Sequence, residues 1–137
     1  PWIDKLFTNS LPASGHPYFA AIADVQVSAH FLIRRDGELV QYVPIGSRAW
    51  HAGESSYCGR TCCNDFSIGI ELEGEDSTAY ENAQYDALSY LIRTLRLQVD
   101  SLVHAAIVGH SDIAPGRKTD PGEAFDWQAL HARLVTE

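Results

Sequence analysis

The sequence predicts a single α/β domain in which a mixed β-sheet is flanked by helices. Three patterns support this fold class: an Asp-Gly turn between two strand-like runs at 27–43, an alternating run at 66–74, and apolar residues at helical spacing from 85 to 99. The chain has 137 residues, of which 45% are hydrophobic, so it can bury one core. We therefore expect one domain over residues 1–137, without an internal repeat or a long linker.

The sheet is expected to begin with a hairpin. Residues 27–34 and 39–43 are predicted strands, and Asp36-Gly37 between them is a strong signal for a tight turn. Residues 46–64 form the longest predicted loop, which we expect at the rim of a cleft.

The run 66–74 is predicted to be a strand that lines this cleft. Its apolar and its small or acidic residues alternate: Phe66, Ile68, Ile70 and Leu72 against Ser67, Gly69, Glu71 and Glu73. One face would enter the core, while the small residues on the other face would leave room for a ligand. Glu71 would then project into the cleft, although the same pattern also fits a strand face in solvent.

Helices are expected to cover the sheet. Thr78 and Glu81 form a predicted capping box before the longest helix. The apolar residues that follow at helical spacing are Tyr85, Leu88, Ile92, Leu95 and Val99. Asp126 is predicted to cap a last helix, whose inward-facing residues are Trp127, Leu130 and Leu134. Two short helices are expected near the N-terminus, at 2–7 and 17–23.

The C-terminal third has the clearest chemical signature. The apolar run 105–108 predicts a buried strand that delivers His110 at its end. Pro115-Gly116 and Pro121-Gly122 indicate turns, which can fold Asp120 back beside His110. An imidazole and a carboxylate are two of the three protein ligands that an open zinc site uses, with water in the remaining position. A surface histidine and a turn-forming aspartate remain the alternative from these residues alone.

Four segments in one order carry a resemblance over nearly the whole chain: 28–38, 48–53 with Arg-Ala-Trp-His-Ala-Gly, 64–74, and 109–122. Together they resemble the AmpD family of zinc-dependent N-acetylmuramoyl-L-alanine amidases, which are similar in fold to the phage T7 type of lysozyme amidase and to peptidoglycan recognition proteins. The resemblance implies hydrolysis of the amide between 1,6-anhydro-N-acetylmuramic acid and L-alanine of the stem peptide in cell-wall recycling. The expected partner is therefore a muropeptide, and the expected cofactor is zinc.

The resemblance also implies the catalytic residues. His110 matches the second zinc ligand and Asp120 the third, while Glu71 matches the strand glutamate and Lys118 the lysine before the aspartate. Zinc would lower the pKa of its water from about 16 towards about 7 and polarise the scissile carbonyl. Glu71 would pass the proton of the water to the leaving amine, and Lys118 would stabilise the oxyanion.

The family's first zinc ligand has no counterpart in this sequence. That ligand is a histidine at the end of an N-terminal strand, whereas Pro1 begins a stretch that matches a later part of the family pattern. We therefore expect an N-terminally incomplete amidase domain, and a two-ligand site binds zinc weakly. The alternative function is a peptidoglycan-fragment binding module without catalytic activity. A plain structural or interaction domain would not explain the four catalytic matches.

The resemblance implies four substrate-binding residues: His30, Trp50, His51 and Asn64. Trp50 suits a sugar ring, although core packing explains an indole equally well, and His51 can instead hydrogen-bond locally. Related amidases carry arginines where this chain has Gln26 and Cys62, which leaves the peptide specificity open. Arg60 could reach the same anion, but it also fits a solvated loop.

Composition excludes several partners. A net charge of -8 argues against nucleic acid and against an anionic membrane surface, and no apolar run is long enough to span a membrane. Cys58, Cys62 and Cys63 are odd in number, so reduced thiols are the simplest interpretation. Reduced thiols favour a cytoplasmic protein, which we expect to be a monomer.

Overall fold

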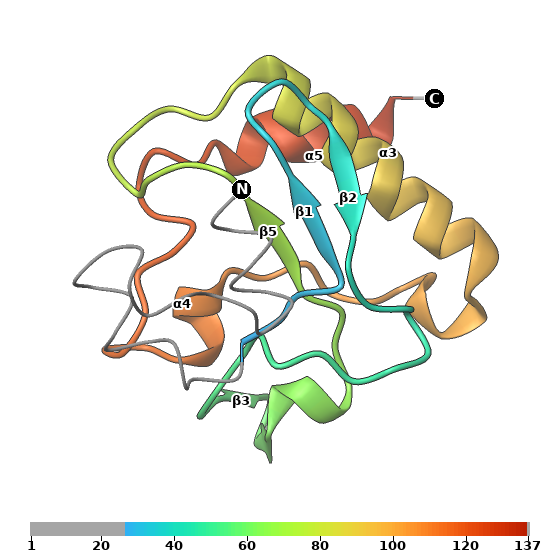
Figure 1. Ribbon diagram of the computed structural model, residues 1–137, viewed down its shortest axis with the longest axis vertical. Helices are drawn as coiled ribbons and strands as arrows, with labels where there is room; N and C mark the ends of the chain where they lie inside the picture. Colours follow the sequence, from blue (N-terminus) through green and yellow to red (C-terminus); the bar gives the residue numbers. More distant parts are fainter. Residues whose placement is uncertain (1–26, 137) are drawn as a thin grey trace, which may run out of the picture. The chain divides into compact units, whose positions relative to one another are not determined.

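A computed structural model describes residues 27–136 (Figure 1). The strands are β1 (Phe31–Ile33), β2 (Leu39–Gln41), β3 (Ser56–Tyr57), β4 (Arg60–Thr61) and β5 (Ile70–Leu72). The α-helices are α3 (Asn82–Gln98), α4 (His110–Ile113) and α5 (Trp127–Val135), and the 3-10 helices are η2 (Cys63–Asp65) and η3 (Asp100–Leu102). The short helices expected at 2–7 and 17–23 lie outside the described residues.

The predicted fold class is confirmed, since a small mixed sheet is accompanied by helices. The three-stranded sheet has the order β2-β1-β5, and β3 pairs with β4 in a separate antiparallel ribbon. The predicted hairpin between β1 and β2 is also confirmed, with shorter strands than expected. Its turn is closed by Arg34 N–H donating to Glu38 O at 2.9 Å and by the Asp36 carboxylate accepting from Glu38 N–H at 2.9 Å.

Contacts divide the described chain into two compact units. The first unit contains residues 27–32 and Val40–Glu71, and the second contains Ile33–Leu39 and residues 72–136. The buried apolar residues of the first unit are Ala29, Phe31, Leu32, Ala49, Ala52 and Cys63. Those of the second unit are Ile33, Tyr85, Leu88, Leu91, Ile92, Ala114, Phe125 and Leu130.

The helices α3 and α5 of the second unit pack against each other (Figure 1). An aromatic cluster joins them. The ring of Phe125 lies 5.3 Å from that of Tyr85 on α3 and 4.8 Å from that of Trp127 on α5. Both predicted helices are confirmed, including the cap of α5, where the Asp126 carboxylate accepts from Ala129 N–H at 3.0 Å. Leu130 is fully buried, as its spacing predicted.

The predicted capping box of α3 is wrong by three residues. Glu81 is the N-cap, and the Gln84 side-chain oxygen accepts from Glu81 N–H at 3.0 Å. Thr78 instead belongs to the preceding turn, in which its N–H donates to Glu75 O. Gln84 fills the capping position because its long side chain reaches back to the N-cap backbone, as a capping-box residue does.

Three local predictions are corrected by backbone hydrogen bonding. The loop 46–64 contains the β3–β4 hairpin, whose turn residues Cys58 and Gly59 have positive φ angles of 50° and 84°. Residues 66–69 are not a strand: the Ser67 hydroxyl donates to Cys63 O, and Gly69 O accepts from both His30 N–H and Phe31 N–H without a regular ladder. Residues 105–108 are not a strand either: within the described chain they have no ladder partner, and Val108 is 41% exposed.

Two sequence features hold in the structure. Cys58, Cys62 and Cys63 are free thiols, as predicted, with Cys63 buried. None of the helices in residues 27–136 combines the length and the apolar character needed to cross a bilayer.

Candidate active site

The loop that carries the candidate metal ligands is closed at its base in the second unit. Ser111 N–H donates to Asp120 O at 3.0 Å, which joins the two ends of the loop. Gly109, the N-cap of α4, donates its N–H to the Asp112 carboxylate at 2.7 Å. A Cβ at Gly109 would lie 2.8 Å from Pro121 Cδ, so only glycine fits this close approach. His110 and Asp120 are thereby brought together from positions ten residues apart, as the turn signals predicted.

His110 and Asp120 are in direct contact. Nδ1 of His110 lies 3.2 Å from Oδ2 of Asp120, and the side chains are 18% and 44% exposed. The hydrogen bond with His110 is the main cause that lowers the pKa of Asp120, and the positive charges of His110 and Lys118 act in the same direction. Partial burial opposes this shift without reversing it. Asp120 is therefore held as a carboxylate, the form that binds a cation.

The donor set of this pair fits zinc. Two ligand atoms that each lie about 2.0–2.1 Å from a tetrahedral zinc ion are about 3.3 Å apart, and the His110–Asp120 separation is 3.2 Å. Imidazole nitrogen and carboxylate oxygen are both common zinc ligands. Among the described residues, no group of three or more His, Cys, Asp or Glu side chains is placed to hold a metal ion.

The segment after Asp120 is anchored to residues 76–80 of the same unit. Tyr80 donates its hydroxyl to Pro121 O at 3.0 Å, and Ala124 N–H donates to Asp76 O at 3.2 Å. The Thr119 hydroxyl also bonds the Asp76 carboxylate. An open pocket of about 500 Å³ lies beside this segment. Its lining residues are Asp76, Ser77, Ser111, Asp112, Thr119, Pro121, Gly122, Glu123 and Trp127.

The two predicted catalytic residues outside the metal pair are both exposed. Lys118 lies in the loop between His110 and Asp120, where its N–H donates to Ala114 O at 3.0 Å. Glu71 is the central residue of β5 and belongs to the first unit.

Trp50 is an exposed aromatic surface in the first unit, with 45% of its area in solvent. Its backbone is fixed by a reciprocal pair of bonds, since Trp50 N–H donates to the Ser28 hydroxyl at 2.9 Å and Ser28 N–H donates to Trp50 O at 3.0 Å. Core packing, the alternative open at the sequence level, does not account for this exposure.

His30 is 1% exposed and bonds the backbone through both ring nitrogens. Gly69 N–H donates to Nδ1 at 3.1 Å, so the ring proton is on Nε2, which donates to Ser47 O at 2.7 Å. The imidazole is therefore neutral and links two segments of the first unit.

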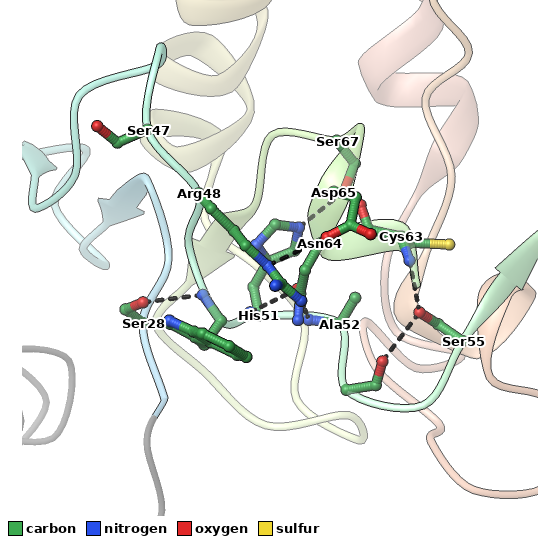
Figure 2. Close-up of polar contacts among 12 residues, drawn as sticks. Ser28, Ser47, Arg48, His51, Ala52, Ser55, Cys63, Asn64, Asp65 and Ser67 are labelled. Atoms are coloured by element: carbon green, nitrogen blue, oxygen red, sulfur yellow. Dashed lines mark hydrogen bonds and ion pairs between the residues drawn. The ribbon is translucent and has the colours of Figure 1, made fainter. Parts of the chain in front are cut away.

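His51 and Asn64 form a second polar cluster that holds the segment after Trp50 (Figure 2). The Asn64 side-chain oxygen accepts from His51 N–H at 3.0 Å and from Ala52 N–H at 2.8 Å. Nε2 of His51 lies 2.8 Å from the Ser67 hydroxyl, which itself donates to Cys63 O at 2.6 Å. Because the hydroxyl proton is used on Cys63, the His51 ring donates to Ser67.

Sequence reasoning missed Arg48. Its guanidinium lies 4.1 Å from the centre of the Trp50 ring and forms an ion pair with Asp65 at 3.3 Å (Figure 2). The available signal was the Arg-x-Trp spacing, because residues two apart in an extended segment share a side.

Comparison with known proteins identifies the family of the chain. Residues 2–123 match the family model described as N-acetylmuramoyl-L-alanine amidase. The chain is 60% identical to 1,6-anhydro-N-acetylmuramyl-L-alanine amidase AmpD of Escherichia coli strain K12, over 100% of this chain and 74% of that protein. It is 59% identical to the AmpD of Enterobacter cloacae, over 99% of this chain and 72% of that protein.

Solved structures confirm the predicted T7 lysozyme/AmpD-like fold. The crystal structure of a selenomethionine AmpD derivative superposes with a TM-score of 0.94 and 56% identity, over 98% of this chain and 75% of that one. The complex of Escherichia coli amidase AmiD with the substrate anhydro-N-acetylmuramic acid-L-Ala-D-gamma-Glu-L-Lys superposes with a TM-score of 0.71 and 37% identity, over 85% of this chain and 51% of that one. The chain belongs to the N-acetylmuramoyl-L-alanine amidase family, as the order of its motifs predicted.

Proposed function

We propose that this chain hydrolyses the amide between 1,6-anhydro-N-acetylmuramic acid and L-alanine of muropeptides during cell-wall recycling, with zinc as its cofactor. The observation that carries the proposal is the His110–Asp120 pair, whose donor atoms lie 3.2 Å apart in a chain of this amidase family. The name of the Escherichia coli and Enterobacter cloacae relatives supports the anhydro-sugar substrate.

His110 and Asp120 would hold the zinc ion. Bound zinc polarises a carbonyl and makes its water a stronger acid. In the metal-free chain the hydrogen bond with His110 lowers the pKa of Asp120, so this ligand is already a carboxylate before the ion binds. His110 must offer an unprotonated Nδ1, which leaves Nε2 to carry the ring proton.

Glu71 would transfer the proton, and Lys118 would stabilise the negative charge that develops on the scissile carbonyl oxygen. Glu71 is an exposed carboxylate, so it can accept a proton from water and return it to the leaving amine. Lys118 is an exposed ammonium whose charge already acts on Asp120. An ammonium near this ligand can stabilise the oxyanion of the tetrahedral intermediate.

Trp50 would provide the contact surface for the sugar, which its exposure supports. The contacts of His30, His51 and Asn64 support an indirect part in substrate binding, because these side chains bond the backbone and Ser67 in the present arrangement. They would keep the Trp50 segment in the shape that receives the ligand.

We also propose that residues 1–137 act as one amidase domain in a monomeric, cytoplasmic protein without nucleic-acid or membrane partners. The family match over residues 2–123 includes parts of both units and supports a single functional domain. The three free thiols support a reducing compartment, and the net charge of -8 disfavours polyanionic partners.

The test is mass-spectrometric detection of peptide released from anhydromuramyl-tripeptide, first with zinc and then with a chelator. Zinc-dependent release that Asp120→Ala abolishes and Glu123→Ala preserves is the expected result, because Glu123 is an exposed carboxylate of the same segment. Binding of the muropeptide without release would instead support the noncatalytic binding module.

A further inference from the structure

Asp120 lies inside a tight turn of the second unit. Gly122 N–H donates to Thr119 O at 2.9 Å, so Asp120 is one of the two residues that this bond encloses. The carbonyl of Asp120 also accepts from Ser111 N–H at 3.0 Å, and Ser111 directly follows His110 in the chain. The backbone positions of both members of the metal pair are therefore tied to the same turn.

Two side chains from the segment before α3 hold the residues on either side of Asp120. The Thr119 hydroxyl, one residue before Asp120, donates to the Asp76 carboxylate. The Tyr80 hydroxyl donates at 3.0 Å to the carbonyl of Pro121, one residue after Asp120. The turn is thus held at both ends by groups that come from more than forty positions earlier in the chain.

The two holding groups are themselves fixed against the rest of the second unit. The Tyr80 ring meets the ring of Phe125 edge to face at 5.6 Å, and Phe125 is buried. Asp76 O accepts from Ala124 N–H at 3.2 Å. A Cβ at Gly122 would lie 2.6 Å from Asp76 O, a close approach that only glycine permits. Neither Asp76 nor Tyr80 can therefore shift without disturbing packed neighbours.

The spacing that results is close to that of two zinc ligands. Nδ1 of His110 lies 3.2 Å from Oδ2 of Asp120, against about 3.3 Å for two ligand atoms on a tetrahedral ion. A site that already holds this spacing loses little further conformational freedom when the ion binds. Removing a group that orients a metal ligand typically weakens metal binding about 10–100-fold.

We propose that Tyr80 and Asp76 are positioning residues, which hold Asp120 at ligand spacing by acting through Pro121 and Thr119. This inference rests on the proposed function, since it assumes that zinc binds to Asp120. Neither side chain is a ligand in this proposal. Without them the turn could move, and part of the free energy of zinc binding would be used to restore its position.

The test is a calorimetric titration of the metal-free chain with zinc chloride. Tyr80→Phe removes the hydroxyl and keeps the ring, and it should weaken zinc binding about tenfold. Asp76→Ala should weaken it by a similar factor. Asp76→Asn keeps an oxygen acceptor for the Thr119 hydroxyl, so its affinity should stay within about twofold of that of the parent. Zinc bound elsewhere, for example by exposed thiols, is measured with Asp120→Ala and subtracted.

Tyr85→Phe is the matched control. The Tyr85 hydroxyl accepts from Asp126 N–H at 2.8 Å, and its ring lies 5.3 Å from that of Phe125. The control thus loses the same group from the same aromatic cluster, outside the turn of the metal pair. Both Tyr→Phe variants should lower the free energy of unfolding of the metal-free chain, because each loses a hydrogen bond to the backbone. Only Tyr80→Phe should also reduce the extra stability that added zinc provides.

Three results would overturn the inference: a Tyr80→Phe variant that binds zinc as tightly as the parent, a Tyr85→Phe variant that loses as much affinity, or an Asp76→Asn variant as weak as Asp76→Ala. The last result would show that Asp76 acts through its charge instead of its hydrogen bond. In each case zinc-dependent cleavage by the parent would still uphold the proposed function. A parent that binds no more zinc than Asp120→Ala would overturn both the inference and the proposed zinc site.

Discussion

Replacing Gly69 with alanine should destabilise the chain through one side chain, His51. Gly69 is buried, and a Cβ at this position would contact Cγ of the His51 ring and lie 2.7 Å from both Cδ2 and Nδ1. The backbone cannot retreat, because Gly69 N–H is bonded to the His30 ring at 3.1 Å and Gly69 O accepts from His30 N–H at 3.0 Å. The His51 ring must therefore move.

The expected loss of stability has two parts. Forcing a methyl group into a packed site costs about 1–3 kcal/mol. Displacing the ring also breaks the His51–Ser67 hydrogen bond of 2.8 Å, which contributes about 0.5–1.5 kcal/mol. We therefore expect Gly69→Ala to lower the free energy of unfolding by about 2–4 kcal/mol.

Urea denaturation followed by circular dichroism measures this loss. Gly46→Ala is the control, because a Cβ there would meet nothing within 4 Å and the backbone φ is not in the left-handed region. It should change stability by less than about 1 kcal/mol. In the double variant Gly69→Ala/His51→Ala the clash is absent, so the two losses should not add. A Gly69→Ala variant as stable as the parent, or strictly additive losses, would show that the new methyl group does not clash with His51.

Three further predictions concern the metal pair and the support of β5. Asp120→Ala should lower both zinc content and turnover, whereas Lys118→Ala should lower turnover about a hundredfold or more at nearly unchanged zinc content. Equal zinc loss in the two variants, measured by elemental analysis, would contradict this division of roles. The pKa of Asp120 is lowered in the folded state, so this carboxylate stabilises the metal-free chain above its unfolded pKa of about 3.9. This stabilisation is lost as the pH falls through the folded pKa, so the free energies of unfolding of the parent and of Asp120→Asn should converge at the lowest pH. A difference in free energy that stays constant with pH would argue against the shift. Gln84→Ala should lower the free energy of unfolding in urea by about 1–3 kcal/mol, because the fully buried Gln84 side chain donates to Glu73 O at 2.9 Å. The control Gln128→Ala, on the exposed side of α5, should lower it by less than about 0.5 kcal/mol. Similar losses in the two variants would contradict a structural role for the buried Gln84.

The helices and the first hairpin could be predicted because their signals are local. The spacing of Tyr85, Leu88 and Ile92 depends on one helix, and Asp36-Gly37 specifies its turn through the backbone of adjacent residues. The strand prediction at 66–69 was wrong. Alternating apolar and polar residues indicate that the two faces of a segment differ in polarity, but they do not indicate whether the segment forms a regular ladder with another strand. In the structure, Ser67 bonds the carbonyl of Cys63, four residues earlier.

The candidate site could be predicted in part. The contact between His110 and Asp120 follows from turn residues close in sequence, so the pairing was accessible before the structure. The position of His110 on a one-turn helix was not, because the apolar run 105–108 has the composition of a strand. The contacts of Arg48 with Trp50 and of Arg60 with Phe66 depend on side-chain placement between segments, which composition does not specify.

Zinc held by His110 and Asp120 can be detected directly by the anomalous scattering of a zinc-grown crystal at the zinc absorption edge. We expect a peak within about 2.0–2.2 Å of Nδ1 of His110 and of a carboxylate oxygen of Asp120. A peak elsewhere, or zinc bound in solution at full stoichiometry by the Asp120→Ala variant, would contradict this zinc site.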